Sequence, residues 1–177
     1  VAIIGAGSLV FCKTLMNDFL ATPALAGSEY SLMALTHTRL DKMHSFVERM
    51  IADNGVDATV TKTTDRREAL KDADYVVVMI QVGGVDAFQV DYEIPMKYGV
   101  DQCIGDTLGP GGVFRAARHI WALMEIAEDM RELCPNALLL NYANPMAICC
   151  WALGTVPGLQ YVGLCHGCLL YTSDAAD

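Results

Sequence analysis

The chain has 177 residues, of which 53% are hydrophobic, and its 21 acidic against 12 basic side chains give a formal net charge of −9. This composition can fill the core of one domain and excludes an intrinsically disordered chain. The acidic balance argues against nucleic acid or an anionic membrane surface as a partner. The most apolar long window, residues 137–156, carries two asparagines and a proline in its middle, so no membrane span is expected.

Apolar runs and amphipathic stretches alternate along the chain. The expected strands are residues 1–4, 31–35, 58–61, 75–80, 137–140 and 161–164; the expected helices are residues 9–20, 39–52, 65–72, a segment after 83–84, 113–133 and a segment after 145. Strands that alternate with helices predict βαβ units and a parallel sheet. The glycine-rich stretch 105–112 is expected to be a loop. The predicted fold class is therefore α/β, a Rossmann-like doubly wound parallel sheet.

A glycine-rich turn joins the first expected strand to the first expected helix. Gly5 permits a tight turn, Gly7 lets a pyrophosphate approach the backbone, and the helix start offers N–H groups. We therefore expect Gly5, Ala6, Gly7 and Ser8 to bind a dinucleotide cofactor. Val10 replaces the third glycine of the usual motif, so a glycine turn without a ligand stays the alternative.

The second expected strand lacks the acidic residue that usually binds the adenosine ribose, because residues 33–37 read Met-Ala-Leu-Thr-His. Three explanations are open. The ribose is held in another way, or His37 or Arg39 favours a 2′-phosphate and hence NADP, or two compensating reading-frame errors have turned codons for Asp-Ile-Asp-Pro into Ala-Leu-Thr-His.

Polar residues follow several strands, at the edge where open α/β sheets bind ligands. Gln81 lies at such a strand end, and Asn141 and Asn144 follow another, where they can bind a nicotinamide ribose or a substrate hydroxyl, although helix capping before a proline is the alternative for Asn144. Cys165 is a candidate metal ligand, and His166 a candidate substrate-binding or catalytic proton-transfer residue, since adjacent residues of an extended chain point to opposite sides and rarely bind one metal ion together. The alternative for Cys165 is a buried core thiol.

The glycine-rich stretch supplies the remaining candidates. We expect Asp106 to be a catalytic-site residue that contacts a sugar hydroxyl, and Arg118 to serve the surface or a loop carbonyl. A plain connection between two elements is the alternative for this stretch.

Six segments together make the chain resemble glycoside hydrolase family 4, and most of all its α-galactosidase and α-glucosidase branch. They are IGAGSLVF (4–11), DADYVVV (72–78), QVGG (81–84), DTLGPGGVFRAAR (106–118), LNYANPMA (140–147) and VGLCHG (162–167). The resemblance implies a fold related to lactate and malate dehydrogenases, with NAD and a divalent metal ion, usually Mn²⁺, as cofactors. The activity that it implies is hydrolysis of small-molecule α-glycosides.

In that family, the sugar is oxidised at C3, the aglycone leaves by elimination across C1–C2, water adds, and the ketone is reduced again. By position, the resemblance implies that Gly5, Gly7 and Ser8 hold the pyrophosphate and that Cys165 binds the metal. It implies in the same way that Gln81 and Asn141 line the cofactor cleft and that Asn144 touches substrate. It also implies that the family's tyrosine base and second metal ligand lie beyond this sequence.

The sequence further indicates a fragment of a cytoplasmic enzyme that forms homo-oligomers when complete. We expect residues 1–167 to be its NAD-binding domain, with the C-terminal domain missing, and residues 168–177 to be a non-native tail encoded by a sequencing adapter. Two other readings stay open. One is a lactate/malate-type hydroxy-acid dehydrogenase, which needs no metal and releases NADH, and the other is a non-catalytic nucleotide-binding fragment.

Overall fold

The computed structural model describes residues 1–103 and 105–165, which fall into two compact units. The first unit comprises residues 1–79 and 129–137, and the second comprises residues 80–128 together with the chain from residue 138 onward.

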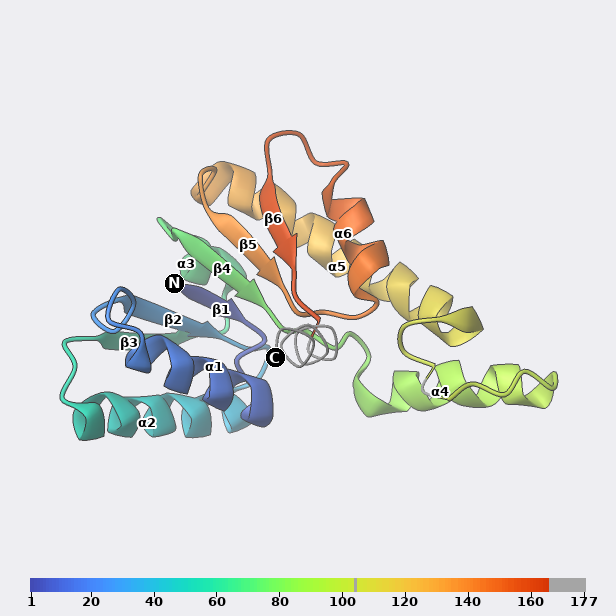
Figure 1. Cartoon of the computed structure of the whole chain (residues 1–177), viewed down its shortest axis with the longest axis horizontal. Helices are drawn as coiled ribbons and strands as arrows, with labels where there is room; N and C mark the ends of the chain where they lie inside the picture. The colour runs from blue at the N-terminus through green and yellow to red at the C-terminus, as the bar shows by residue number, and fades with distance from the viewer. Residues whose placement is uncertain (104, 166–177) are drawn as a thin grey trace, which may run out of the picture. The chain divides into compact units, whose positions relative to one another are not determined.

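The first unit is built on four parallel strands in the order β3-β2-β1-β4 (Figure 1). The strands are β1 (Ala2–Ile4), β2 (Glu29–Met33), β3 (Thr59–Thr63) and β4 (Tyr75–Val78). Ile3 of the central strand lies opposite Leu32 on one side and Val77 on the other, and all three side chains are fully buried. The apolar runs of β1 and β4 are typical of a parallel sheet that helices cover on both faces.

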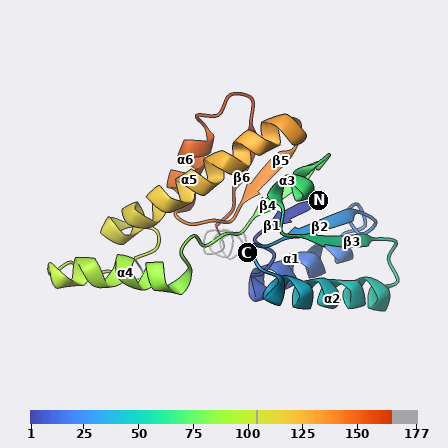
Figure 2. The ribbon, with the colours of Figure 1, turned by 180° about the vertical axis from the view of Figure 1, so that it is seen from behind.

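Three helices cover these strands: α1 (Leu9–Ala21), α2 (His37–Asn54) and α3 (Arg66–Leu70). Figures 1 and 2 show α1 and α2 on one face and α3 on the other. Each long helix turns an apolar stripe inward, and the buried residues are Cys12, Met16 and Leu20 in α1 and Leu40, Met43 and Val47 in α2. This three-to-four-residue spacing is the reason these stretches fold as amphipathic helices. Gly55, in the left-handed conformation, ends α2.

The second unit contains α4 (Gly84–Lys97), most of α5 (Gly109–Leu133), β5 (Leu138–Asn141), α6 (Met146–Leu153) and β6 (Gln160–Gly163). β5 and β6 pair in parallel, with Leu139 opposite Tyr161, and α6 connects them. The last five residues of α5, from Asp129 to Leu133, belong to the first unit. There Asp129 accepts hydrogen bonds from Arg66 and Arg67 of α3, each at 2.6 Å.

The elements follow the sequence prediction with two informative differences. Helix α5 begins at Gly109 rather than at residue 113, so the second half of the expected glycine loop is helical, and Pro110 suits a first turn because it needs no N–H partner there. Strand β2 runs from residue 29 to 33 and ends two residues early, which leaves Ala34 and Leu35 beyond it. In the part of the chain that the structure describes, no helix is both long and apolar enough to cross a bilayer.

Candidate functional site

The turn between β1 and α1 is held against the ends of β2 and β4. The backbone N–H groups of Gly5 and Ala6 both donate to the carbonyl of Met33, at 3.0 and 2.9 Å. Gly5 has φ +96°, and a Cβ at this position would lie 2.5 Å from the carbonyl oxygen of Met79. Glycine is therefore required at residue 5 by the fold itself, whether or not a ligand binds.

Gly7 differs, because the fold leaves room for a side chain there. A Cβ on Gly7 would meet its nearest neighbour, the Cβ of Arg39, at an ordinary 3.5 Å. Beside it, Ser8 makes no side-chain cap, and the N–H groups of Leu9 and Val10 in the first turn of α1 have no backbone acceptor within residues 1–103 and 105–165. An open approach beside unused N–H groups at a helix start fits the pyrophosphate of a dinucleotide.

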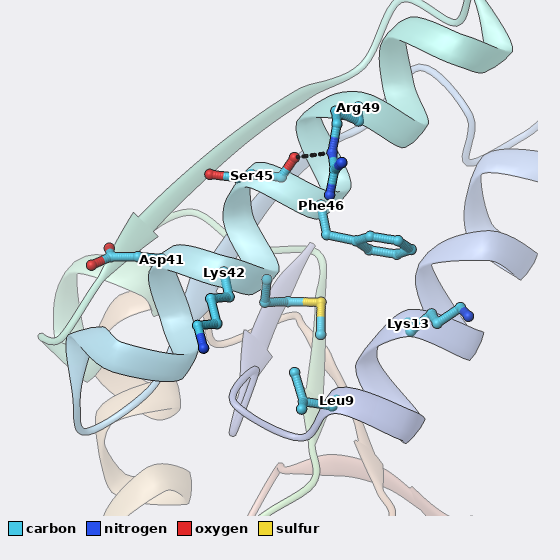
Figure 3. Close-up of a pocket in the computed structure, with 8 residues that line it drawn as sticks. Leu9, Lys13, Asp41, Lys42, Ser45, Phe46 and Arg49 are labelled. Atoms are coloured by element: carbon cyan, nitrogen blue, oxygen red, sulfur yellow. Dashed lines mark hydrogen bonds between the residues drawn. The ribbon is translucent and has the colours of Figure 1, made fainter.

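A separate groove of about 620 Å³ lies between α1 and α2 (Figure 3). Phe46 of α2 has the Lys13 ammonium 5.8 Å from its ring centroid and the Arg49 guanidinium 6.0 Å from it. Asp41, the acidic residue at this groove, pairs with Lys62 at 2.6 Å. None of the candidate residues in the glycine turn or at the strand ends lines this groove. It is therefore a surface groove between two helices, beside the glycine turn.

In the second unit, the structure brings Asp106 and Asn144 together, although they are far apart in the sequence. The Asn144 amide donates to Oδ2 of Asp106 at 3.1 Å, while the Thr107 hydroxyl donates to Oδ1 at 3.0 Å. Asn144 does not cap α6, because Pro145 is the cap residue and no side chain bonds there, so the capping alternative is wrong. Both Asp106 and Asn144 are partly exposed, and their oxygens keep lone pairs for a ligand hydroxyl.

Arg115, on α5, fixes the backbone beside this pair. Its Nε donates to the carbonyl of Asn144 at 3.2 Å, and its guanidinium lies 5.8 Å from the centroid of the Phe88 ring. Only 8% of Arg115 is exposed. Burial lowers the pKa of its guanidinium, an effect that the carboxylates of Asp106 and Asp91 oppose. Arg115 therefore orients the asparagine and adds positive charge near the Asp106 carboxylate.

Close packing explains the glycine-rich sequence at the start of α5. A Cβ on Gly111 would lie 2.5 Å from the carbonyl oxygen of Gly105 and 2.8 Å from that of Asp91. The Gln102 side chain joins the same segments, because it accepts from the Gly111 N–H at 2.9 Å and donates to the Asp91 carbonyl at 3.3 Å. These contacts hold the segment that carries Asp106.

A buried ion pair joins α4 to α5. The Asp91 side chain is 2% exposed, and both its oxygens accept from Arg118, with Nη1 to Oδ1 at 2.9 Å. The expectation for Arg118 was incomplete, because this residue bonds the Phe114 carbonyl but has the buried carboxylate as its main partner. The sequence did not indicate this pairing, because a charged residue in an amphipathic helix is usually on the surface.

Two of the predicted cofactor residues make local contacts. Asn141 is fully buried, and its side chain both accepts from the Ala143 N–H at 3.1 Å and donates to the Ala143 carbonyl at 3.2 Å. It therefore shapes the turn that leads to Asn144. The Gln81 amide donates to the Gly84 carbonyl at 3.2 Å. Contact of either residue with a cofactor stays a prediction.

His119, which the sequence did not single out, is completely buried beneath the segment that follows β4. Its Nε2 accepts from the Val82 N–H at 3.3 Å, so the proton of the neutral ring lies on Nδ1, which donates to the Arg115 carbonyl at 2.9 Å. Burial is the largest cause that lowers the pKa of this imidazole, and the positive charges of Arg115 and Arg118 act in the same direction. Both ring nitrogens are thus used by the neutral form.

We expect His119 to make the stability of the chain fall with acidification. The folded pKa is lowered, so below the unfolded value of about 6.5 the unfolded chain binds the proton first, and stability is lost as the pH falls from there through the folded pKa. His119→Gln keeps an acceptor for Val82 without a titrating ring and should reduce this pH dependence. Urea unfolding of both proteins at pH 7.5 and 5.5 measures it; equal pH dependence in the two would contradict the assignment.

The metal-site prediction rests on Cys165, and the predicted proton-transfer residue is its neighbour in the sequence, His166. Cys165 comes two residues after β6 and is partly buried, whereas His166 lies outside the described residues, as does the expected tail 168–177. Within the described ranges, no group of three or more His, Cys, Asp and Glu side chains is placed to hold a metal ion. The described residues therefore offer Cys165 as a single candidate ligand, not a complete metal centre.

The fold and the glycine turn define a Rossmann-like nucleotide-binding α/β protein. The family model for family 4 glycosyl hydrolases matches residues 1–176, and the chain belongs to this family. It is 44% identical over 168 residues to an α-galactosidase of Rhizobium meliloti and 41% identical over 175 residues to one of Bacillus subtilis, covering 94% and 98% of this chain. The chain spans 34% and 40% of the length of these two relatives.

Solved structures agree with this family assignment. A Bacillus subtilis protein with a provisional glucosidase assignment matches 99% of the chain and 40% of its own, with a TM-score of 0.87 and 30% identity. A 6-phospho-α-glucosidase from gut microorganisms, solved with NAD and Mn²⁺, matches 92% of the chain and 38% of its own, with a TM-score of 0.81 and 25% identity. Lactate dehydrogenase from Eimeria maxima, at 13% identity and a TM-score of 0.62, shares the fold alone. The predicted fold class is confirmed.

Proposed function

We propose that this chain is the cofactor-binding part of a cytoplasmic α-glycosidase that hydrolyses small α-galactosides or α-glucosides with NAD and a divalent metal ion. The observation that supports the proposal is the hydrogen-bonded Asp106–Asn144 pair, whose carboxylate and amide can bind sugar hydroxyls, in a chain that also has an open glycine turn. The 44% and 41% identity to two α-galactosidases extends over 94% and 98% of this chain, whereas the same 44% identity to a 6-phospho-β-glucosidase extends over 72% of it, and this difference in coverage supports the α-galactoside class.

In this proposal, the residues of this chain bind the cofactor and orient the sugar. When bound, the nicotinamide supplies a hydride acceptor for C3 of the sugar and returns the hydride at the end, and the metal ion supplies a Lewis acid for the negative charge that develops when the C2 proton leaves. Gly7, with the N–H groups of Leu9 and Val10, receives the pyrophosphate.

Asp106 and Asn144 position the sugar. The Asp106 carboxylate accepts from an amide and a hydroxyl, which hold it in place, and its remaining lone pairs can accept from a sugar hydroxyl. Arg115 holds the Asn144 backbone, which limits how far the amide can turn. An ordinary paired-carboxylate glycosidase needs a second acidic residue as nucleophile or base, and the route through oxidation and elimination does not.

Cys165 is proposed as one ligand of the metal ion, with His166 beside it as a proton-transfer residue. A thiolate at the carboxyl end of a strand is suited to a divalent ion. The gut 6-phospho-α-glucosidase with bound Mn²⁺, 25% identical to this chain, supports the metal requirement.

A chimera tests the proposed function. Residues 1–167 of this chain replace the matching segment of the Rhizobium meliloti α-galactosidase, to which the chain is 44% identical. We expect release of nitrophenol from p-nitrophenyl α-galactoside or α-glucoside that requires NAD⁺ and Mn²⁺, with no net NADH.

The controls in the chimera separate the candidate roles. Cys165→Ser should weaken Mn²⁺ binding, measured by the fraction of free Mn²⁺ in electron paramagnetic resonance, and leave NAD⁺ affinity unchanged, since the glycine turn is built from β1 and α1. A folded chimera that cleaves no glycoside and instead produces stoichiometric NADH from a hydroxy acid would favour the dehydrogenase reading. Unchanged Mn²⁺ affinity in Cys165→Ser would show that Cys165 is a core thiol.

A further inference from the structure

The end of β2 lies directly against the glycine turn. Met33, the last residue of β2, accepts the hydrogen bonds of Gly5 and Ala6 through its carbonyl. The next residue, Ala34, has its Cβ 3.7 Å from the position of a Cβ on Gly7. In dinucleotide-binding folds this strand end meets the adenosine ribose, and an acidic side chain there binds the 2′-hydroxyl of NAD. Ala34 stands at that point and offers neither a carboxylate nor its negative charge.

No other carboxylate replaces the missing one along this segment. Residues 33–40 contain no Asp or Glu, and the first acidic residue after β2 is Asp41. Its carboxylate accepts from the Lys62 ammonium at 2.6 Å, and this hydrogen bond is the largest cause that lowers its pKa. Asp41 is therefore ionised and already paired with a lysine, so it neither binds a ribose diol nor repels a phosphate strongly.

Arg39 instead brings positive charge to the turn. In its side chain, Cβ and Cδ would lie 3.5 and 3.9 Å from a Cβ on Gly7, so the aliphatic stem runs past the glycine turn. The residue is exposed, and its guanidinium forms no hydrogen bond or ion pair with the described part of the chain. An arginine without a carboxylate partner beside the ribose position is the arrangement that accommodates a 2′-phosphate.

We propose that the adenosine-ribose subsite formed by Ala34 and Arg39 accepts a 2′-phosphate, so that this chain binds NADP⁺ at least as tightly as NAD⁺. The inference rests on the proposed function, because it assumes that the glycine turn holds a nicotinamide dinucleotide. It goes beyond that function by naming the form of the cofactor and the residues that select it.

Binding of the two cofactors to the purified chain tests the inference without any enzyme assay. Isothermal titration calorimetry with NADP⁺ and with NAD⁺ is expected to give a Kd for NADP⁺ equal to or below that for NAD⁺. Arg39→Met keeps the aliphatic stem and removes the charge, so it should weaken NADP⁺ binding about tenfold and change NAD⁺ binding less than about twofold. The matched control is Arg49→Met, at another exposed arginine of α2, which should change neither affinity.

Ala34→Asp tests the same subsite from the opposite side. A carboxylate there should strengthen NAD⁺ binding and weaken NADP⁺ binding by at least about tenfold, because it accepts from the 2′-hydroxyl and repels a phosphate. A parent chain that binds NAD⁺ more tightly than NADP⁺, or an Arg39→Met variant that loses both cofactors equally, would overturn the inference and leave the proposed function intact. A folded chain that binds neither cofactor would overturn the assignment of the glycine turn itself.

Discussion

The Gly7→Val chain is expected to fold and to bind its nicotinamide dinucleotide about a hundredfold more weakly than the parent chain. A Cβ at residue 7 has only ordinary contacts, the nearest at 3.5 Å, and its φ lies outside the left-handed region, so the fold tolerates a side chain there. The valine methyl groups would instead occupy the space through which the pyrophosphate approaches the backbone. Overpacking of this kind costs about 1–3 kcal/mol, which corresponds to about one to two powers of ten in affinity.

Calorimetric titration with the dinucleotide measures this loss, and thermal unfolding confirms that the variant is folded. Gly5→Ala is the contrasting variant. Its Cβ would lie 2.5 Å from the Met79 carbonyl oxygen at φ +96°, so it should lower stability even without a ligand. A folded Gly7→Val chain with unchanged affinity would show that the cofactor does not approach through this turn.

Asp91→Ala is expected to lower the free energy of unfolding by about 3–5 kcal/mol, the cost typical of breaking a buried ion pair. The Asp91 carboxylate is 2% exposed and accepts two hydrogen bonds from Arg118, whose Nε is buried without another partner among the described residues. Removing the carboxylate leaves a partly buried guanidinium without its counter-charge.

Urea unfolding of parent and variant at neutral pH gives the difference. The double variant Asp91→Ala/Arg118→Met removes both charges and should recover part of the loss, since no unpaired charge stays behind. If Asp91→Ala costs less than about 1 kcal/mol, or if the double variant is the less stable of the two, the pair is not the buried anchor between α4 and α5 that its burial indicates.

Local patterns predicted most of the fold and the position of the glycine turn between β1 and α1. The run Tyr-Val-Val-Val at β4 and the apolar stripes of α1 and α2 are readable because burial repeats with the period of the element. Gly5 was predictable in the same way, since a glycine between a strand and a helix indicates a turn that needs its conformational freedom.

Long-range pairing could not be read from the sequence. Arg115 meets the carbonyl of Asn144, 29 residues further on, and Asp91 meets Arg118, 27 residues further on. Neither pair has a spacing signature, and an arginine or aspartate in a helix is usually on the surface. The burial of His119 could not be predicted either, because its partner is the Val82 N–H, a backbone group that leaves no pattern in the side chains.

Solvent exchange at C2 of the sugar tests most directly whether glycoside cleavage follows the proposed oxidation and elimination. The chimera with the Rhizobium meliloti α-galactosidase hydrolyses an α-glycoside in D₂O, and NMR of the released sugar measures deuterium at C2. The proposed route removes the C2 proton and returns one from solvent, so we expect deuterium at C2 in the released sugar, dependent on added dinucleotide and Mn²⁺. Cleavage that leaves the C2 hydrogen untouched, and that proceeds without a dinucleotide, would contradict the account.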